Sequence, residues 1–204
     1  MRRLWILAVL AIVVAAPAAY ADSITLNITM GSTLPNGNYG TLTLNLNAVT
    51  HAIDVTVSLA PNYSIATGQD VAIGFSSSLS PDPTISVTGL PTGYSLLLGG
   101  VPNSQHADGF GFVEYGITGP LPSSGDKVQS LAFSITTAGG FSSVYDLISP
   151  STGGAASSSW VFDIITPTGA TGIVGVGTPV PEPASLLLLG SGLLGLAALV
   201  RRRR

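Results

Sequence analysis

The chain has 204 residues, 46% of them hydrophobic, contains no cysteine and carries a formal net charge of −3. Without cysteine, disulfide bonds, thiolate metal ligands and a cysteine nucleophile are excluded. Six of the seven basic residues lie in the two terminal segments and nine of the ten acidic residues lie between them, so the middle has Lys127 against nine carboxylates, a formal charge of −8. Nucleic-acid binding needs cationic groups against phosphates, so it is excluded as well.

The first 21 residues have the three parts of a secretory signal peptide. Arg2 and Arg3 supply the positive charge, an apolar run follows, and the small-residue site Ala19-Tyr20-Ala21 ends the segment. We expect cleavage after Ala21 and export through the Sec translocon. The alternative, an uncleaved signal anchor, is disfavoured because the apolar run is too short to span a bilayer comfortably.

Residues 22–166 are rich in Gly, Ser, Thr and Asn, and polar and apolar residues alternate there with a period of two. This alternation is typical of half-buried β-strands. The predicted strands cover 24–30, 41–47, 52–59, 71–75, 85–87, 94–98, 110–117, 128–136 and 160–164, and 142–148 fits either a helical turn or a strand. Trp160 shares a face with Phe162 and Ile164 and is expected in the core, with Asp163 pointing outward. Short strands with turns between them indicate an all-β domain, an antiparallel β-sandwich or jelly roll.

Residues 167–179 are rich in Gly, Pro and Thr and show no periodic pattern, so we expect a flexible linker there. The segment Pro181-Glu182-Pro183 follows it. Each proline fixes its own φ and disfavours a helical conformation in the residue before it, so this segment is expected to be rigid and extended.

Residues 184–200 are uncharged. As a helix this segment would be about 25 Å long, at the short end of what spans a bilayer. The chain closes with Arg201, Arg202, Arg203 and Arg204. Such a basic cluster would stay cytoplasmic and leave the preceding domain outside the membrane.

The order of these three parts in residues 180–204 resembles the PEP-CTERM sorting signal of Gram-negative bacteria. The resemblance implies that exosortase, a membrane-embedded cysteine protease/transpeptidase, recognises Pro181, Glu182 and Pro183 and processes the chain close to them. It further implies a transient inner-membrane anchor and a final place at the cell surface or in the extracellular exopolysaccharide matrix. The alternative is an ordinary single-pass anchor with a proline-rich linker.

The middle of the chain offers weak signals for chemistry. No Gly-x-Ser-x-Gly nucleophile motif occurs. His106 and Asp108 lie two residues apart and could form a metal or acid-base pair, and Asp108 could serve a calcium site built from distant loops. A solvated histidine and scattered surface carboxylates are the simpler interpretation. We therefore predict no catalytic residue, no metal site and no cofactor.

Two hypotheses for the exported domain follow. The first is a non-catalytic surface or matrix protein associated with exopolysaccharide or biofilm. The second is a secreted carbohydrate-binding module or polysaccharide-acting enzyme with the same tail, for which a cluster of Asp108, Glu114 and Tyr115 around one cleft would be the sign. Candidate aromatic platforms for stacking against sugars are Tyr39, Tyr63, Tyr94, Tyr115 and Tyr145.

Overall fold

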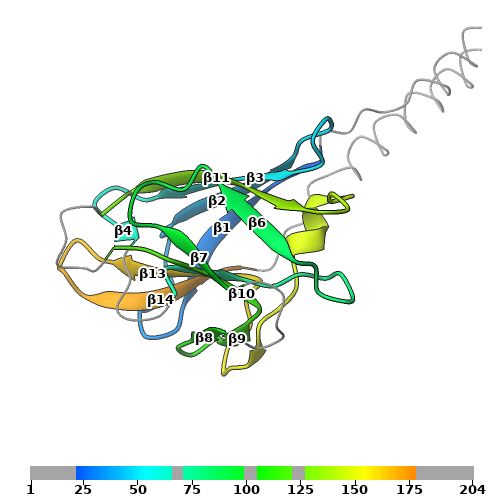
Figure 1. Cartoon of the computed structure of the whole chain (residues 1–204). Coiled ribbons are helices and arrows are strands. Elements are labelled where there is room, and N and C mark those ends of the chain that lie inside the picture. Colours follow the sequence, from blue (N-terminus) through cyan, green and yellow to red (C-terminus); the bar gives the residue numbers. More distant parts are fainter. Residues whose placement is uncertain (1–21, 66–70, 99–104, 121–126, 178–204) are drawn as a thin grey trace, which may run out of the picture.

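The computed structural model describes residues 22–65, 71–98, 105–120 and 127–177 (Figure 1). The predicted signal segment 1–21 and the predicted sorting signal 180–204 lie outside these residues. Within the described ranges, no helix is long and apolar enough to cross a bilayer.

The described residues form fourteen strands and one short 3-10 helix. In chain order they are β1 (Ser23–Gly31), β2 (Gly40–Leu46), β3 (Ile53–Leu59), β4 (Ser64–Ile65), β5 (Ile73–Phe75), β6 (Ile85–Thr88), β7 (Ser95–Leu98), β8 (Gln105–Ala107), β9 (Gly111–Val113), β10 (Tyr115–Thr118), β11 (Ser130–Thr137), η1 (Val144–Leu147), β12 (Thr152–Gly153), β13 (Trp160–Ile165) and β14 (Thr171–Val176). The predicted all-β, antiparallel class is confirmed. The segment 142–148, which the sequence left open, contains the helical turn η1.

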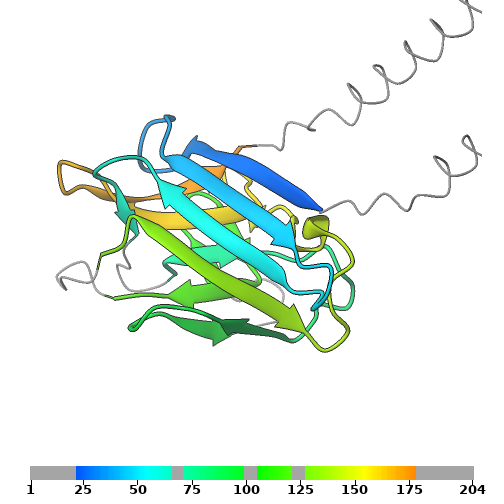
Figure 2. The ribbon, with the colours of Figure 1, turned by 90° about the horizontal axis from the view of Figure 1, so that it is seen from above.

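Eleven of the strands join into one antiparallel sheet with the order β6-β11-β3-β2-β1-β14-β13-β5-β10-β7, with β4 beside β13. The two end strands, β6 and β7, contact each other, so the sheet rolls up into a nearly closed barrel. Figure 2 shows β1, β2, β3 and β11 as one layer of neighbouring strands lying over the rest.

A sandwich would have two separate sheets. Here the sheet is continuous, because β1 belongs to both layers. Its residues from Ser23 to Ile28 pair with β2, and Ile28, Met30 and Gly31 pair with β14. The pairing with β14 shifts register between Ile28 and Met30. A bulge of this kind bends a strand, which lets β1 leave one layer and enter the other.

The strands form where the sequence alternates. Ile53, Val55, Val57 and Leu59 of β3 are all buried, and the residues between them face outward or are only partly covered. On the outer face of the neighbouring strands, the hydroxyls of Thr25 and Thr43 are 3.1 Å apart across the β1–β2 pair. Each of these strands has one apolar and one polar face, and the apolar faces determine which side of the layer packs on the core.

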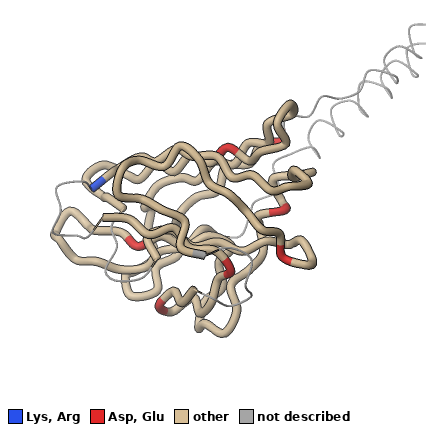
Figure 3. Tube along the Cα trace, in the orientation of Figure 1, with Lys and Arg blue, Asp and Glu red and all other residues tan. Residues whose placement is uncertain are grey.

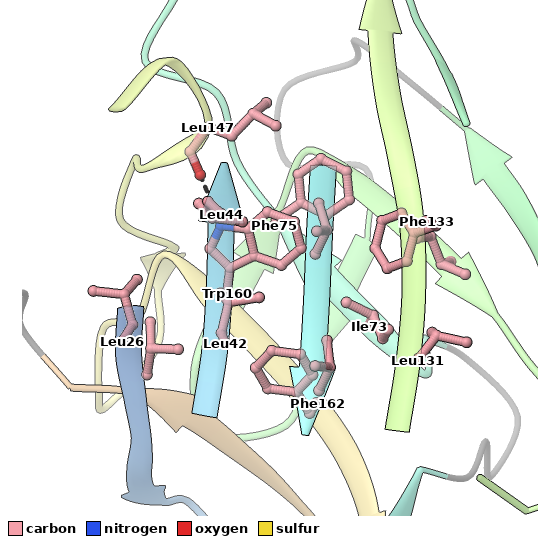
Figure 4. Packing of buried hydrophobic residues seen from close by; sticks show 14 of the residues in the cluster. Leu26, Leu42, Leu44, Ile73, Phe75, Leu131, Phe133, Leu147, Trp160 and Phe162 are labelled. Atoms are coloured by element: carbon pink, nitrogen blue, oxygen red, sulfur yellow. Dashed lines mark hydrogen bonds between the residues drawn. The ribbon is translucent and has the colours of Figure 1, made fainter. Parts of the chain in front are cut away.

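Three aromatic rings cross the opposite layer at the same register. Phe75 of β5 pairs with Trp160 of β13 on one side and with Tyr115 of β10 on the other. The Phe75 ring stacks on Trp160 with 4.3 Å between centroids and on Tyr115 with 5.2 Å. The indole N–H of Trp160 donates a hydrogen bond of 2.8 Å to the carbonyl of Leu147 (Figure 4). The prediction that Trp160 lies in the core is confirmed.

A second, three-stranded sheet with the order β12-β9-β8 packs on the outer face of the barrel. Its inner residues Ala107 and Val113, together with Phe110, pack against Val161 of β13 in a small second core. Gly175 and Gly74, the two residues that pair with Val161, leave the space that this second core occupies. A Cβ on Gly74 would lie 2.7 Å from a methyl of Val113, and one on Gly175 would lie 2.6 Å from the hydroxyl of Ser158.

The single strand predicted over 110–117 is wrong. Gly111–Val113 is β9 of the small sheet and Tyr115–Thr118 is β10 of the barrel, and Glu114 lies between them. The alternation continues through Glu114, but the chain changes partners there. The residue pattern alone carries no information about that change.

Two other expectations need correction. The predicted linker 167–179 contains β14, which lies between β1 and β13 in the sheet, so the folded domain continues past residue 166. Gly172 and Gly175 interrupt the apolar pattern of this strand, so the sequence pattern does not reveal a strand there. Asp163 was expected to point to solvent, but it is only 9% exposed, as every position of β13 is buried.

Candidate functional site

The outer sheet presents one row of exposed side chains. His106 of β8, Phe112 of β9 and Thr152 of β12 occupy paired positions across the three strands, and all three are exposed. Phe112 is 41% exposed, and its ring meets the imidazole of His106 edge-on with 5.1 Å between centroids. The opposite face of the sheet is buried against Val161, which holds the row on a fixed support.

His106 and Asp108, which the sequence analysis singled out, do lie together. The Nδ1 atom of His106 is 3.3 Å from a carboxylate oxygen of Asp108, and the two side chains are 53% and 74% exposed. An exposed pair of this kind is well hydrated and contributes little to stability. It does orient the imidazole beside the ring of Phe112.

A cluster of Glu114 and Tyr115 with Asp108 was named as the sign of the second hypothesis, but Glu114 and Tyr115 both have structural partners. The Glu114 carboxylate accepts a hydrogen bond of 2.7 Å from the backbone N–H of Ser77. Tyr115 is fully buried and its hydroxyl donates a 2.7 Å hydrogen bond to the carbonyl of Pro83. Figure 3 shows the acidic residues of the described chain spread over separate parts of the fold.

Burial raises the pKa of Glu114; the hydrogen bond from Ser77 lowers it in part, and the carboxylate of Asp82 adds to the rise. Burial likewise raises the pKa of the Tyr115 hydroxyl, with smaller contributions from Glu114 and Asp82. A carboxyl with a raised pKa can mark a catalytic acid, but ion-pair and structural networks give the same sign. Here Glu114 fastens the junction of β9 and β10 to the segment after β5.

Most of the tyrosines proposed as sugar platforms are covered. Tyr39, Tyr94 and Tyr115 are at most 7% exposed. Tyr39 donates a hydrogen bond to the carbonyl of Pro35 and packs edge-on against Tyr63. Tyr145, on η1, is 51% exposed. The platform interpretation is therefore wrong for the three buried tyrosines.

A pocket of about 220 Å³ lies between residues 148–159 and the end of β14, and serines 157–159 line part of it. The hydroxyl of Ser158 is already engaged, at 2.6 Å from the carbonyl of Trp160 and 3.1 Å from that of Val176. Its geometry is that of a structural serine that ties two strands together. Among the described residues, no three His, Asp or Glu side chains gather as a metal site would require.

Sequence reasoning missed Phe112. Phe110 and Phe112 alternate within the one strand predicted over 110–117, and in the structure Phe110 is fully buried whereas Phe112 is exposed. The signal that could have separated them is the glycine between them. Gly111 has φ +83°, and a Cβ there would lie 2.1 Å from the carbonyl oxygen of Thr152.

The PEP-CTERM protein-sorting motif family model matches residues 179–204. The chain therefore carries a PEP-CTERM protein-sorting motif at its C-terminal end. No match was found among curated proteins or among solved structures.

The PEP-CTERM motif makes this an exported protein that exosortase processes at the membrane before surface release. The predicted motif residues Pro181, Glu182 and Pro183, the arginine cluster Arg201 to Arg204 and the signal site Ala19 and Ala21 lie outside the described residues. They remain predictions from the sequence.

The two ends of the described β domain are both tied into the fold. A carboxylate oxygen of Asp22, the predicted mature N-terminus, accepts a 2.8 Å hydrogen bond from the backbone N–H of Val144. The backbone N–H of Gly177 donates a 3.1 Å hydrogen bond to the carbonyl of Asn27. The folded domain therefore reaches to within a few residues of the sorting motif.

Proposed function

We propose that this is a non-catalytic protein of the cell surface or extracellular matrix, delivered by exosortase and associated with exopolysaccharide in a biofilm. The PEP-CTERM motif at residues 179–204 is the observation that carries the proposal. A signal peptide at residues 1–21 would deliver the chain to the Sec translocon. Residues 184–200 and the four arginines would hold it in the inner membrane until processing.

The non-catalytic part of the proposal rests on how the candidate groups are used. Glu114 accepts from a backbone N–H, the Tyr115 hydroxyl donates to a backbone carbonyl, and Ser158 contacts two carbonyls. A nucleophile or general acid needs a side chain that can reach a substrate. The competing hypothesis, a polysaccharide-acting enzyme, predicts hydrolysis of the producer's own exopolysaccharide by the purified protein.

Replacing Pro181, Glu182 and Pro183 by alanine tests the sorting step. The variant should accumulate in the membrane fraction at full length, because the recognition element is gone while the anchor is intact. Immunoblots of membrane and extracellular fractions, with wild type alongside, report the result. Processing and release at the wild-type level would overturn the proposal.

A further inference from the structure

The row His106-Phe112-Thr152 places an exposed aromatic ring between two exposed polar side chains. Phe112 is a large apolar residue that is 41% exposed, one of four such residues in the described part of the chain. On either side of it along the row stand an imidazole and a hydroxyl. An exposed aromatic ring beside polar groups can pack on an apolar ligand face while its neighbours exchange hydrogen bonds with the same ligand.

The row is fixed before any ligand arrives. The residues behind it, Ala107 and Val113, are buried, and the edge-on contact with His106 limits the tilt of the Phe112 ring. Gly153 has φ +78°, and a Cβ on it would lie 3.6 Å from the ring of Phe112. A glycine there leaves this side of the ring without a side-chain cover. A rigid aromatic loses little side-chain entropy on binding.

The charge of the domain restricts the ligand. Asp108 stands beside His106 with 74% of its side chain exposed, and the exported domain holds nine carboxylates against Lys127. A polyanion, such as a uronic-acid polymer, would be repelled. A neutral pyranose has an apolar C–H face for the ring and hydroxyls for the imidazole, carboxylate and threonine.

We propose that the exposed face of the β8-β9-β12 sheet, centred on Phe112 with His106, Asp108 and Thr152, is a binding site for a neutral polysaccharide. The sugar lays its C–H face on Phe112 and its hydroxyls exchange hydrogen bonds with the polar groups of the row. This inference deepens the proposed association with exopolysaccharide and rests on it. It assigns that association to one face of the molecule.

The test uses affinity electrophoresis of detergent-solubilised full-length protein, so its result does not depend on sorting. Native gels contain dextran, hydroxyethyl cellulose or galactomannan as neutral polysaccharides, or alginate as the anionic one. Wild type should be retarded by at least one neutral polymer and not by alginate. F112A should weaken that retardation at least about tenfold in apparent Kd, as expected for loss of a central aromatic contact.

Two variants control the test. F112W keeps an aromatic platform and should retain binding, and Y145A removes a comparably exposed ring on η1 and should bind as wild type. Melting curves of all variants check that they are folded. The inference is overturned by no retardation in any neutral polymer, by F112A binding like wild type, by Y145A losing as much as F112A, or by retardation in alginate alone. Self-association through Phe112 in sedimentation, without polysaccharide binding, also overturns it.

Discussion

Trp160 makes two kinds of contact at once. Its ring stacks on Phe75, and its indole N–H donates to the carbonyl of Leu147, which ties the end of η1 to the core. Buried indole groups that find such a partner combine a large apolar area with a satisfied polar group. The fold of this layer therefore depends on a hydrogen bond as well as on burial.

Trp160→Phe separates these contributions. The phenyl ring can keep the stack with Phe75, but the carbonyl of Leu147 loses its donor. An unsatisfied buried carbonyl, with some lost volume, should lower the free energy of unfolding by about 1–3 kcal/mol. Urea denaturation measures this loss. The matched control, Tyr145→Phe, removes an exposed hydroxyl and should stay within about 0.5 kcal/mol of wild type.

Glu114 makes stability depend on pH. Burial raises its pKa in the folded state, so the folded protein holds this proton more tightly than the unfolded chain does. The resulting stabilisation is present below the unfolded pKa and is lost as the pH rises through the folded pKa. In wild type, this contribution therefore falls between acid and neutral pH.

Glu114→Gln should remove that contribution, since the amide does not ionise and its oxygen can still accept from Ser77. The difference in free energy of unfolding between pH 4 and pH 7 should shift in favour of pH 7 relative to wild type. Urea denaturation at both pH values is the measurement. Superimposable pH profiles for the two proteins would show that Glu114 is not perturbed as described.

At the scale of elements, the small outer sheet depends on two glycines beneath it. Gly175→Ala would place a methyl 2.6 Å from the hydroxyl of Ser158 and 2.9 Å from the ring of Phe110. Overpacking of this kind costs about 1–3 kcal/mol. Hydrogen exchange should rise more in β8, β9 and β12 than in β2 and β3.

Gly139→Ala is the matched control, because a Cβ there meets nothing within 4 Å. It should leave both stability and exchange close to wild type. Equal exchange rates in the outer sheet of Gly175→Ala and Gly139→Ala would contradict the packing described for Gly175.

The strands of the layer with β2 and β3 were predictable from the sequence, and those of the layer with β13 and β14 were less so. β2 and β3 alternate cleanly, because one of their faces meets the core and the other meets solvent. β13 and β14 are covered on more of both faces, so Asp163 is buried and the glycines of β14 replace side chains where neighbours come close. Alternation reports a half-buried strand and fails where both faces are covered.

At the candidate site, too, the local sequence pattern predicted only part of what the structure shows. The spacing of His106 and Asp108, which is local information, raised their pairing as a possibility, and the two do lie together. The separation of Glu114 and Tyr115 from them depends on the chain changing sheets after Val113, and the exposure of Phe112 depends on which sheet β9 joins. Contacts between distant segments decide both, and within residues 105–117 the only local signal is Gly111, which bears on the exposure of Phe112 alone.

At the scale of the whole molecule, β14 shortens the connection to the sorting motif. Three residues separate Gly177 from Pro181, a reach of at most about 14 Å. Deletion of residues 178–180 should therefore slow processing strongly, because it presses the folded domain toward the membrane. A ten-residue Gly-Ser insertion after Gly177 should preserve processing. Pulse-chase labelling measures both rates, and wild-type processing of the deletion variant would contradict this view.

The central claim is that exosortase processes this chain and releases the β domain. Intact-mass analysis of the extracellular protein, from isogenic cells with and without exosortase, tests it most directly. With exosortase, the released chain should begin at Asp22 and lack Arg201 to Arg204; without it, the protein should remain in the membrane with its arginines. An extracellular chain that still carries the four arginines, or equal release from both strains, would contradict the account.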